Sequence, residues 1–322
     1  MASRDVAAAG SAGFRSGPRP KLTAARPRHG ERLIVGLLGL CAVVSVITTI
    51  AIVLSLFTPT IEFFEQVSFR EFFSFGEWAP QFADARFGVF EIVAGTVNVT
   101  LWAIVFGVPL GLGSAIYLSE YASDRVRQTL KPTLEVLAGV PTVAFGFFAL
   151  TFITPILRDV WPEALSDPPG IFSAGAAGLV LGIMILPIIA SISDDAMRSV
   201  PSGLREGAYA LGGTRLQVAT RVVVPAALSG IVASFVLGIS RAIGETMVVL
   251  IAAGNTPNLT LNPVESIQTM TAFIANTATG DIGVGTLTYD TIFAVGALLF
   301  LITLVLNMIS IRLVRRYREV YE

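Results

Sequence analysis

The chain has 322 residues, of which 53% are hydrophobic and 14% charged, whereas an ordinary soluble domain carries about 25% charged residues. This composition excludes a typical soluble domain, and the formal net charge of −1 gives no basic bias that would indicate nucleic-acid binding. One cysteine, Cys41, and one histidine, His29, exclude an internal disulfide, a thiolate zinc site and a His-assisted catalytic triad within the chain.

The two lysines further limit the chemistry that the chain can perform alone. Neither Lys21 nor Lys131 follows a glycine, so the chain has no phosphate-binding loop of the form G-x-x-x-x-G-K-[ST]. If a nucleotide is used, another chain must bind it. We therefore expect that this chain is not an enzyme and holds no metal.

Six long apolar runs predict an all-α polytopic membrane protein. A bilayer with a hydrocarbon core of about 30 Å needs about 20 apolar helical residues to cross it. The fifth run is long enough to tilt or to protrude. The six predicted membrane-spanning helices are residues 33–57, 92–118, 134–157, 171–192, 224–253 and 291–313.

The distribution of lysine and arginine predicts the orientation of these helices. Seven basic residues precede the first run, three lie in 119–133, four in 193–223 and four from residue 312 onward. The alternate segments hold two in 58–91, one in 158–170 and none in 254–290. Because cytoplasmic loops carry the excess of positive charge, both termini are predicted to be cytoplasmic.

The segments outside the core runs divide the chain further. Residues 1–32 are expected to be a disordered cytoplasmic tail and 314–322 a second tail, while 92–313 form the core. Residues 58–91 follow the first run and combine six acidic residues with many phenylalanines, which predicts an external interfacial segment. Its aromatic side chains would anchor at the headgroup level or would dock an external partner. Residues 254–290 are predicted to include an external or partly re-entrant helix over 264–275.

The longest inner loop carries a spaced motif. Glu206, Gly207 and Ala208 are followed by Gly212 and then by Val222, Val224 and Pro225. A short helix is expected through 204–211, with Ser202 as its N-cap and Gly212 and Gly213 closing it. The spacing E-[AG]-A-x-x-x-G-x(9)-[IV]-x-[LV]-P resembles the EAA motif of ABC importer permeases. It departs from that motif by Gly207 in place of the first alanine and by valines at the Ile and Leu positions.

That resemblance implies a role for the loop. In ABC importer permeases the motif forms a coupling helix that sits in a groove of a cytoplasmic ATPase, which would assign residues 203–213 as the ATPase contact. The alternative from the residues alone is that Glu206 only caps a helix and that the two glycines only form a turn.

A charged residue lies inside the fifth run. Arg241 is followed four residues later by Glu245, so the two side chains are expected to share one helix face and to pair. A guanidinium offers a planar fork of donors that matches two oxygens of a tetrahedral oxyanion. We therefore predict an oxyanion path at Arg241 and Glu245 with the neighbouring Thr246. The alternative is a self-neutralising pair that only lowers the cost of membrane insertion or clamps a neighbouring helix.

Other polar and small residues occur in the second and third runs. Asn98 and Thr100 are candidates for the path, although hydrogen bonding between helices would also explain them. Gly107, Gly111 and Gly113 are expected to permit close helix packing.

Three further strings point to a narrower family. They are GTVNVTLWAIVFGVPLGLGSAIYLSEYAS at 95–123, LAGVPTVAFGFFAL at 137–150 and SRAIGETM at 240–247. Together they look like the PstC-type permease subunits of bacterial phosphate ABC importers, and the resemblance is strongest over 92–313. It implies a six-helix type I (MetI-like) permease in the bacterial plasma membrane, with Arg241 and Glu245 on the phosphate path.

The same resemblance implies the partners. They are a homologous PstA-type permease that forms the other half of the path, a PstB-type ATPase dimer that holds ATP and magnesium, and a PstS-type external phosphate-binding protein. Two other functions stay open from the residues. One is an equivalent permease for sulfate, molybdate or phosphonate, and the other is an ATP-independent channel or secondary transporter.

Overall fold

The computed structural model describes residues 29–162 and 167–316, and the predictions for residues 1–28 and 317–322 lie outside them. The chain divides into two units, residues 1–53 and residues 54–322. The described part of the first unit is the apolar amino-terminal portion of helix α1, which begins at His29. Helix α1 therefore starts inside the expected tail 1–32. The helices and strands are α1 (His29–Gln66), α2 (Phe69–Phe72), β1 (Trp78–Ala79), β2 (Arg86–Phe87), α3 (Phe90–Ile116), α4 (Asp124–Ala138), α5 (Thr142–Phe148), α6 (Thr154–Val160), α7 (Ala174–Arg198), α8 (Ser202–Ala210), α9 (Arg215–Val218), α10 (Val224–Ala226), α11 (Leu228–Ile243), α12 (Met247–Ala252), α13 (Met270–Thr279) and α14 (Leu287–Arg316), with π-helical turns η1 (Tyr117–Tyr121), η2 (Ala149–Ile153) and η3 (Ala219–Val223).

The helices confirm the predicted fold class. Among the described residues, five helical stretches are long and apolar enough to cross a membrane: Gly30–Gln66, Phe90–Tyr121, Thr142–Val160, Ala174–Arg198 and Leu287–Arg312. A sixth span exists if Arg215–Ala226 and Leu228–Ile243, which meet at a bend of 75°, count as one.

Two predicted boundaries are wrong. Residues 134–138 belong to the amphipathic helix α4 rather than to the third span, because Gly139 ends α4 and the following span starts only after Pro141. The fifth span ends at Ile243, where Gly244 is the C-cap, so residues 247–252 form the separate short helix α12. In both places a helix ends although the residues on either side of the end are apolar.

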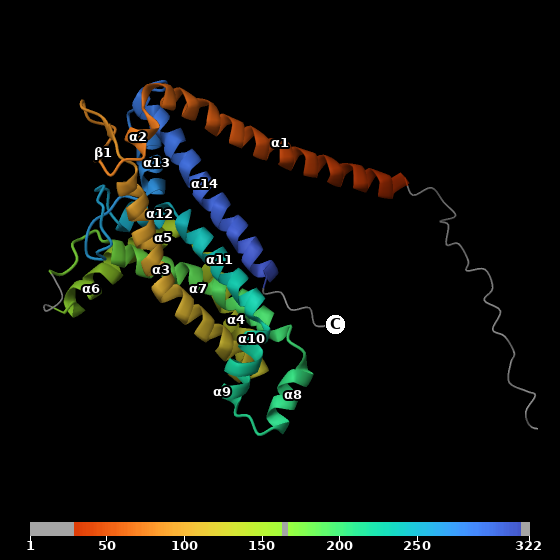
Figure 1. The fold of residues 1–322 in the computed structure, drawn as a ribbon. Helices are drawn as coiled ribbons and strands as arrows, with labels where there is room; N and C mark the ends of the chain where they lie inside the picture. Colours follow the sequence, from red (N-terminus) through yellow and green to blue (C-terminus); the bar gives the residue numbers. More distant parts are fainter. Residues whose placement is uncertain (1–28, 163–166, 317–322) are drawn as a thin grey trace, which may run out of the picture. The chain divides into compact units, whose positions relative to one another are not determined.

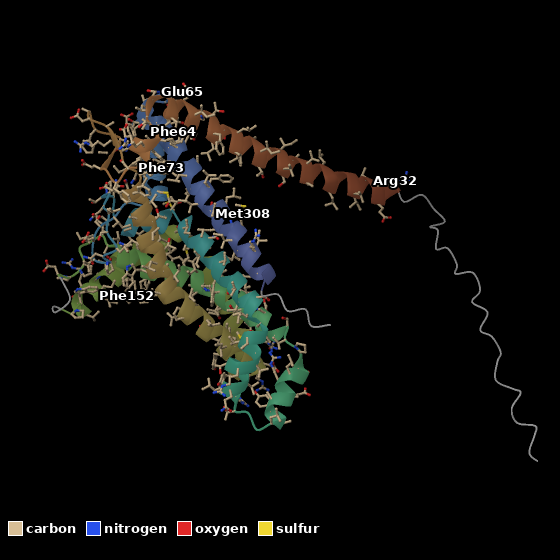
Figure 2. The ribbon with its side chains drawn as sticks, in the orientation of Figure 1. Arg32, Phe64, Glu65, Phe73, Phe152 and Met308 are labelled. Carbon is tan, nitrogen blue, oxygen red and sulfur yellow. The ribbon has the colours of Figure 1, made fainter. Side chains whose placement is uncertain are left out.

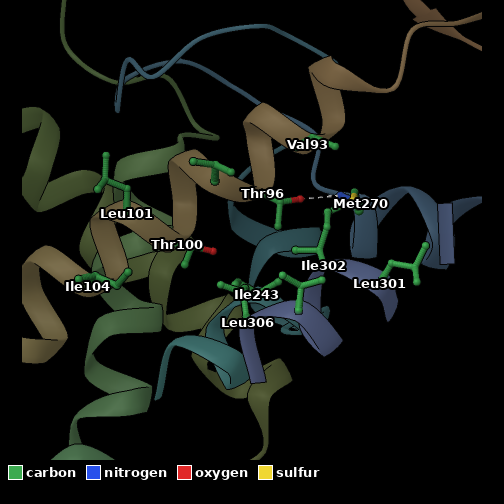
Figure 3. Close-up of a pocket in the computed structure, with 12 residues that line it drawn as sticks. Val93, Thr96, Thr100, Leu101, Ile104, Ile243, Met270, Leu301, Ile302 and Leu306 are labelled. Carbon is green, nitrogen blue, oxygen red and sulfur yellow. Dashed lines mark hydrogen bonds between the residues drawn. The ribbon is translucent and has the colours of Figure 1, made fainter. Parts of the chain in front are cut away.

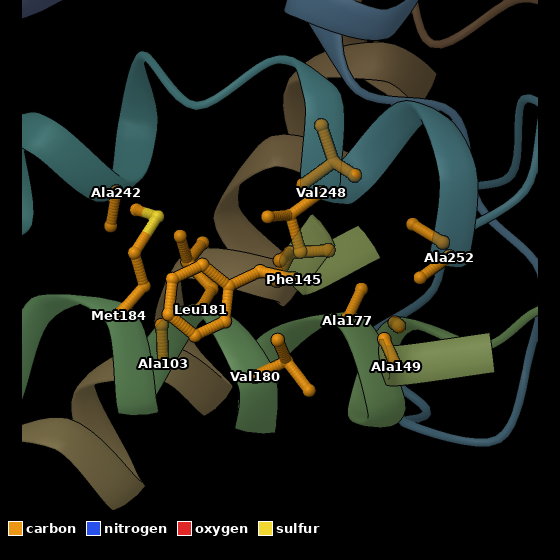
Figure 4. Packing of buried hydrophobic residues seen from close by; sticks show 14 of the residues in the cluster. Ala103, Phe145, Ala149, Ala177, Val180, Leu181, Met184, Ala242, Val248 and Ala252 are labelled. Carbon is orange, nitrogen blue, oxygen red and sulfur yellow. The ribbon is translucent and has the colours of Figure 1, made fainter. Parts of the chain in front are cut away.

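Helices α3 and α7 share the most extensive helix contact in the second unit. Gly178 and Gly182 of α7 face Ala103 and Gly107 of α3, so the two backbones approach closely. The predicted packing role is confirmed for Gly107 and Gly111, whereas a Cβ on Gly113 would meet nothing within 4 Å. The prediction for Gly113 is therefore wrong. Phe145, Val180, Leu181 and Val248 extend this core toward α5 and α12 (Figure 4).

Aromatic residues form a second core at the end predicted to be external. Phe63 packs edge-to-face on Phe72 with 5.6 Å between ring centroids, and Trp78 packs on Phe273 of α13 at 4.9 Å. The strands β1 and β2 pair antiparallel beside them. Phe63 and Phe72 are thus buried in the protein, which corrects the expectation that they anchor in the headgroup region. Figure 2 shows Phe64 and Phe73 at the same end of the second unit.

The predicted helix at 264–275 begins later in the structure. Helix α13 starts at Met270, because the Thr269 hydroxyl accepts a hydrogen bond from the Ala272 amide and caps it. Residues 254–269 form an irregular loop before it. Helices α8 and α9 lie at the opposite end of the second unit from α13 and β1 (Figure 1).

Candidate functional site

The site around Arg241 is built on a break between two helices. Arg241 occupies the last turn of α11, where a cation is favoured by the helix dipole, and its side chain is exposed on this chain. Ser240 donates to the Asn307 side chain at 3.1 Å, so this turn is tied to α14. Gly244 ends the helix, and Thr246 precedes α12.

Glu245 lies in the break and is buried, with 8% of its surface exposed. Its Oε1 accepts hydrogen bonds from the amides of Met247 at 3.0 Å and Val248 at 3.3 Å, so the carboxylate caps the start of α12. Thr271 of α13 donates to the Glu245 carbonyl oxygen at 2.7 Å and fixes the backbone there.

The expected pairing of Arg241 with Glu245 is not formed. Because α11 ends at Ile243, the two residues are not one turn apart on a continuous helix. Among the described residues Arg241 has no ion pair. The guanidinium donors of Arg241 are therefore not used within the described residues, and the Glu245 carboxylate accepts hydrogen bonds from backbone amides instead. Thr246 is half-buried beside it, with its hydroxyl 3.5 Å from the Gly244 carbonyl oxygen.

Among the described residues, neither Asn98 nor Thr100 forms a hydrogen bond with Arg241. Asn98 is fully buried and its amide donates to the carbonyl oxygens of Thr260 at 3.0 Å and Asn262 at 3.3 Å, which ties α3 to the loop 254–269. Asn98 thus has a structural role in this conformation. Thr100 lines a groove between α3 and α14 (Figure 3).

That groove has a volume of about 580 Å³ and is almost entirely apolar. Its polar side chains are Thr96 and Thr100, and the Thr96 hydroxyl already accepts from the Met270 amide at 3.0 Å. Arg241 does not line it. A desolvated oxyanion would find no charged donor there, so the groove suits an apolar occupant.

The motif loop forms the expected short helix, α8, which ends before Gly212. Gly212 has a φ of 82°, the left-handed conformation that a glycine adopts without steric cost, and the Gly213 amide donates to the Ala208 carbonyl oxygen at 3.1 Å. The expected N-cap is wrong, because Pro201 is the N-cap and Ser202 is the first helical residue.

The exposed face of α8 is open for a partner. Glu206 and Gly207 are exposed and Ala208 is half-buried, and a Cβ added at Gly207 would meet nothing within 4 Å. Just beyond the helix, the Leu211 side chain is 92% exposed.

Several charged residues that contact each other were missed from the sequence. Arg127 Nη2 of α4 lies 2.7 Å from Oδ2 of Asp194, a fully buried residue of α7, and Lys131 Nζ lies 3.5 Å from the same oxygen. Lys131 also pairs with Asp195. The spacing of Arg127 and Lys131 by four residues places them on one helix face and was the available signal. At the α8 end, Arg205 pairs with Glu120, for which no local spacing gives a signal.

Comparison with known proteins places these features in a family. Residues 107–319 match the family model described as "Binding-protein-dependent transport system inner membrane component". The "Probable ABC transporter permease protein YqgH" of Bacillus subtilis (strain 168) is 35% identical over 277 residues, which cover 85% of this chain and 86% of that protein. The "Phosphate transport system permease protein PstC" of Mesorhizobium japonicum is 34% identical over 247 residues, which cover 72% and 74% of the two chains.

A solved structure shows the same fold. A chain of the bacterial alginate ABC transporter in complex with an alginate pentasaccharide-bound periplasmic protein aligns with a TM-score of 0.63 and 17% identity, covering 89% of this chain and 95% of that chain. The family match covers more than half of the sequence. The chain therefore belongs to the binding-protein-dependent transport system inner membrane components, and it is an integral-membrane permease component of an ABC transporter.

Proposed function

We propose that this chain is a permease subunit of an ATP-driven phosphate importer in the bacterial plasma membrane. It forms half of the translocation path with a homologous PstA-type permease. The relatives named as phosphate transport permeases support the substrate. The observation that carries the proposal is the open guanidinium of Arg241 on an apolar helix.

The physical argument starts from the cost of that charge. A charge near the centre of a bilayer costs at least about 3 kcal/mol, so Arg241 must face protein or water rather than lipid. The Glu245 Oε1 is already bound to two backbone amides, which leaves the Arg241 donors available to an oxyanion. One such cation binds phosphate weakly enough to release it, as a path requires. Thr246 supplies a nearby hydroxyl.

Energy would enter through α8. We assign Glu206, Gly207, Ala208, Gly212 and Gly213 to the contact with a PstB-type ATPase, which binds ATP and magnesium in its own chain. Closure of the ATPase dimer would move α8 and switch the path between inward-facing and outward-facing states. A PstS-type protein would deliver phosphate at the end formed by β1, α13 and the loop 254–269.

Uptake of radiolabelled phosphate tests the role of Arg241. Arg241→Gln should reduce the uptake rate about 100-fold, which corresponds to the loss of charge-assisted hydrogen bonds worth about 3 kcal/mol. Arg241→Lys should retain part of the rate, because it keeps the charge but loses the planar fork. Arg312→Gln is the matched control, since Arg312 is also exposed and has no hydrogen bond or ion pair among the described residues. Wild-type uptake by Arg241→Gln would refute the assignment.

Competition separates phosphate from other oxyanions. Unlabelled phosphate in excess should suppress the labelled uptake, whereas sulfate, molybdate and phosphonate should leave it unchanged. Suppression by one of those anions instead would favour the corresponding permease. Uptake that persists without the ATPase would favour a channel or a secondary transporter.

A further inference from the structure

Helix α8 contacts η3 and α9, but among the described residues its side-chain hydrogen bonds to the ends of α3 and α7 all come from Arg205. No residue of α8 is buried, and only Ala208 packs against the neighbouring apolar cluster around Met197. Arg205, by contrast, is half-buried and points back toward the membrane helices. The hydrogen bonds of Arg205 therefore connect α8 to those helices.

Arg205 makes four hydrogen bonds, and they lead to two different helices. Its Nε and Nη2 donate to Glu120 Oε1 at 3.2 and 3.1 Å, and Glu120 lies in η1 at the end of α3. Its Nη1 donates to the Val200 carbonyl oxygen and its Nη2 to the Met197 carbonyl oxygen, both at 2.7 Å. The side chain of Arg205 is 20% exposed and that of Glu120 is 4% exposed.

The chemistry of the three acceptor oxygens explains why an arginine suits this position. Met197 lies in the last turn of α7 and Val200 two residues beyond its end, where the helix dipole favours a cation. The nearly buried Glu120 carboxylate needs a compensating charge. A guanidinium has five donors in a fixed plane and can serve all of these groups together, whereas a lysine ammonium is a point charge.

We infer that Arg205 is a positioning residue that links α8 rigidly to the ends of α3 and α7, so that displacement of α8 moves both membrane helices. This inference rests on the proposed function, in which α8 receives the motion of the ATPase. Without the Arg205 side chain, α8 stays attached by its chain connections at Pro201 and Gly212 and by its contacts with η3 and α9, but it loses its side-chain hydrogen bonds to the ends of α3 and α7. The ATPase would still bind α8, but its motion would be lost before it reached α3 and α7.

The test uses the whole transporter, purified with its ATPase and reconstituted with the binding protein in lipid vesicles. The two measurements are the amount of ATPase retained on the permease and the number of phosphate ions imported per ATP hydrolysed. In Arg205→Gln the ATPase should be retained at the wild-type level, and the import per ATP should fall about tenfold, the change expected from losing charge-assisted hydrogen bonds. Arg205→Lys should restore part of the ratio. A general loss of folding would lower both measurements together and would not be rescued by lysine.

Variants of Glu120 test the contact between Arg205 and Glu120 from its other side. Glu120→Gln preserves the shape of the acceptor and should also lower the ratio, and the double variant should be no worse than Arg205→Gln alone, because both changes break one link. If Arg205→Gln does not accumulate in the membrane, Glu120→Gln carries the test. Arg198→Gln is the control, since Arg198 is exposed and has no hydrogen bond or ion pair among the described residues.

The outcomes separate this inference from the proposed function. A wild-type import ratio in Arg205→Gln or in Glu120→Gln overturns the role of Arg205, as does full additivity in the double variant. Failure of the wild-type permease to retain any ATPase would instead overturn the proposed function.

Discussion

Replacement of Gly178 by alanine should separate α3 from α7. A Cβ at Gly178 would lie 2.5 Å from the Trp102 Cβ and 3.0 Å from the Val99 carbonyl oxygen. Carbon atoms in contact prefer about 3.5–4.0 Å, so the two helices must move apart by about 1 Å. Helix association in a membrane depends on such close packing, because lipid is as apolar as the side chains.

The magnitude follows from two opposing effects. Overpacking of this kind costs about 1–3 kcal/mol, while replacing glycine by alanine inside a helix gains up to about 1 kcal/mol. Gly113→Ala is the matched control in α3, because its added Cβ would meet nothing within 4 Å and only the gain applies. The two variants should therefore differ by about 2 kcal/mol in the free energy of unfolding.

Thermal unfolding in a mild detergent measures this difference. The melting temperature of Gly178→Ala should lie about 5 °C below that of Gly113→Ala, on the scale of 2–4 °C for about 1 kcal/mol in a domain of this size. Equal melting temperatures, or a higher value for Gly178→Ala, would refute the close approach of the two backbones.

Three other changes test separate parts of the structure. Asp194→Asn should lower the free energy of unfolding by about 3 kcal/mol, because it removes the buried carboxylate that pairs with both Arg127 and Lys131. Asp195→Asn should cost under about 1 kcal/mol, because Asp195 is exposed. Equal losses in denaturation would contradict this. Gly212→Val should release the ATPase during co-purification, because a φ of 82° is strained by about 1–3 kcal/mol for a β-branched residue, and full retention would argue against this position. Glu245→Ala should remove a helix cap worth about 1 kcal/mol and lower phosphate uptake; unchanged uptake would count against its placement.

The membrane helices were predictable because bilayer thickness sets a minimum apolar length. Their ends were less predictable. Gly139 and Pro141 end one helix and begin another inside a run that stays apolar, and Gly244 does the same after Ile243. Composition alone does not reveal a helix end when the residues on both sides of it are apolar. The helical phase did contain one usable signal, since Gly107 lies four residues after Ala103 on the face that meets α7 and Gly113 lies off that face.

The candidate site was likewise predictable only in part. The sequence located the motif helix, because its spacing is local, and it marked Arg241 by the cost of its charge. It misassigned the partner of Arg241, because i, i+4 pairing assumes a continuous helix and the helix ends first. Arg205 and Glu120 are far apart in the chain. Contacts of this kind depend on the tertiary fold and leave no periodic pattern.

The two cores of the second unit should respond differently to cold. The glycine-rich contact of α3 and α7 is held by dispersion within the bilayer, and water takes little part in it. The aromatic cluster of Phe63, Phe72 and Trp78 lies at the end predicted to meet water, where the hydrophobic effect weakens as temperature falls. Cooling or urea should therefore loosen this aromatic cluster while α3 and α7 remain associated.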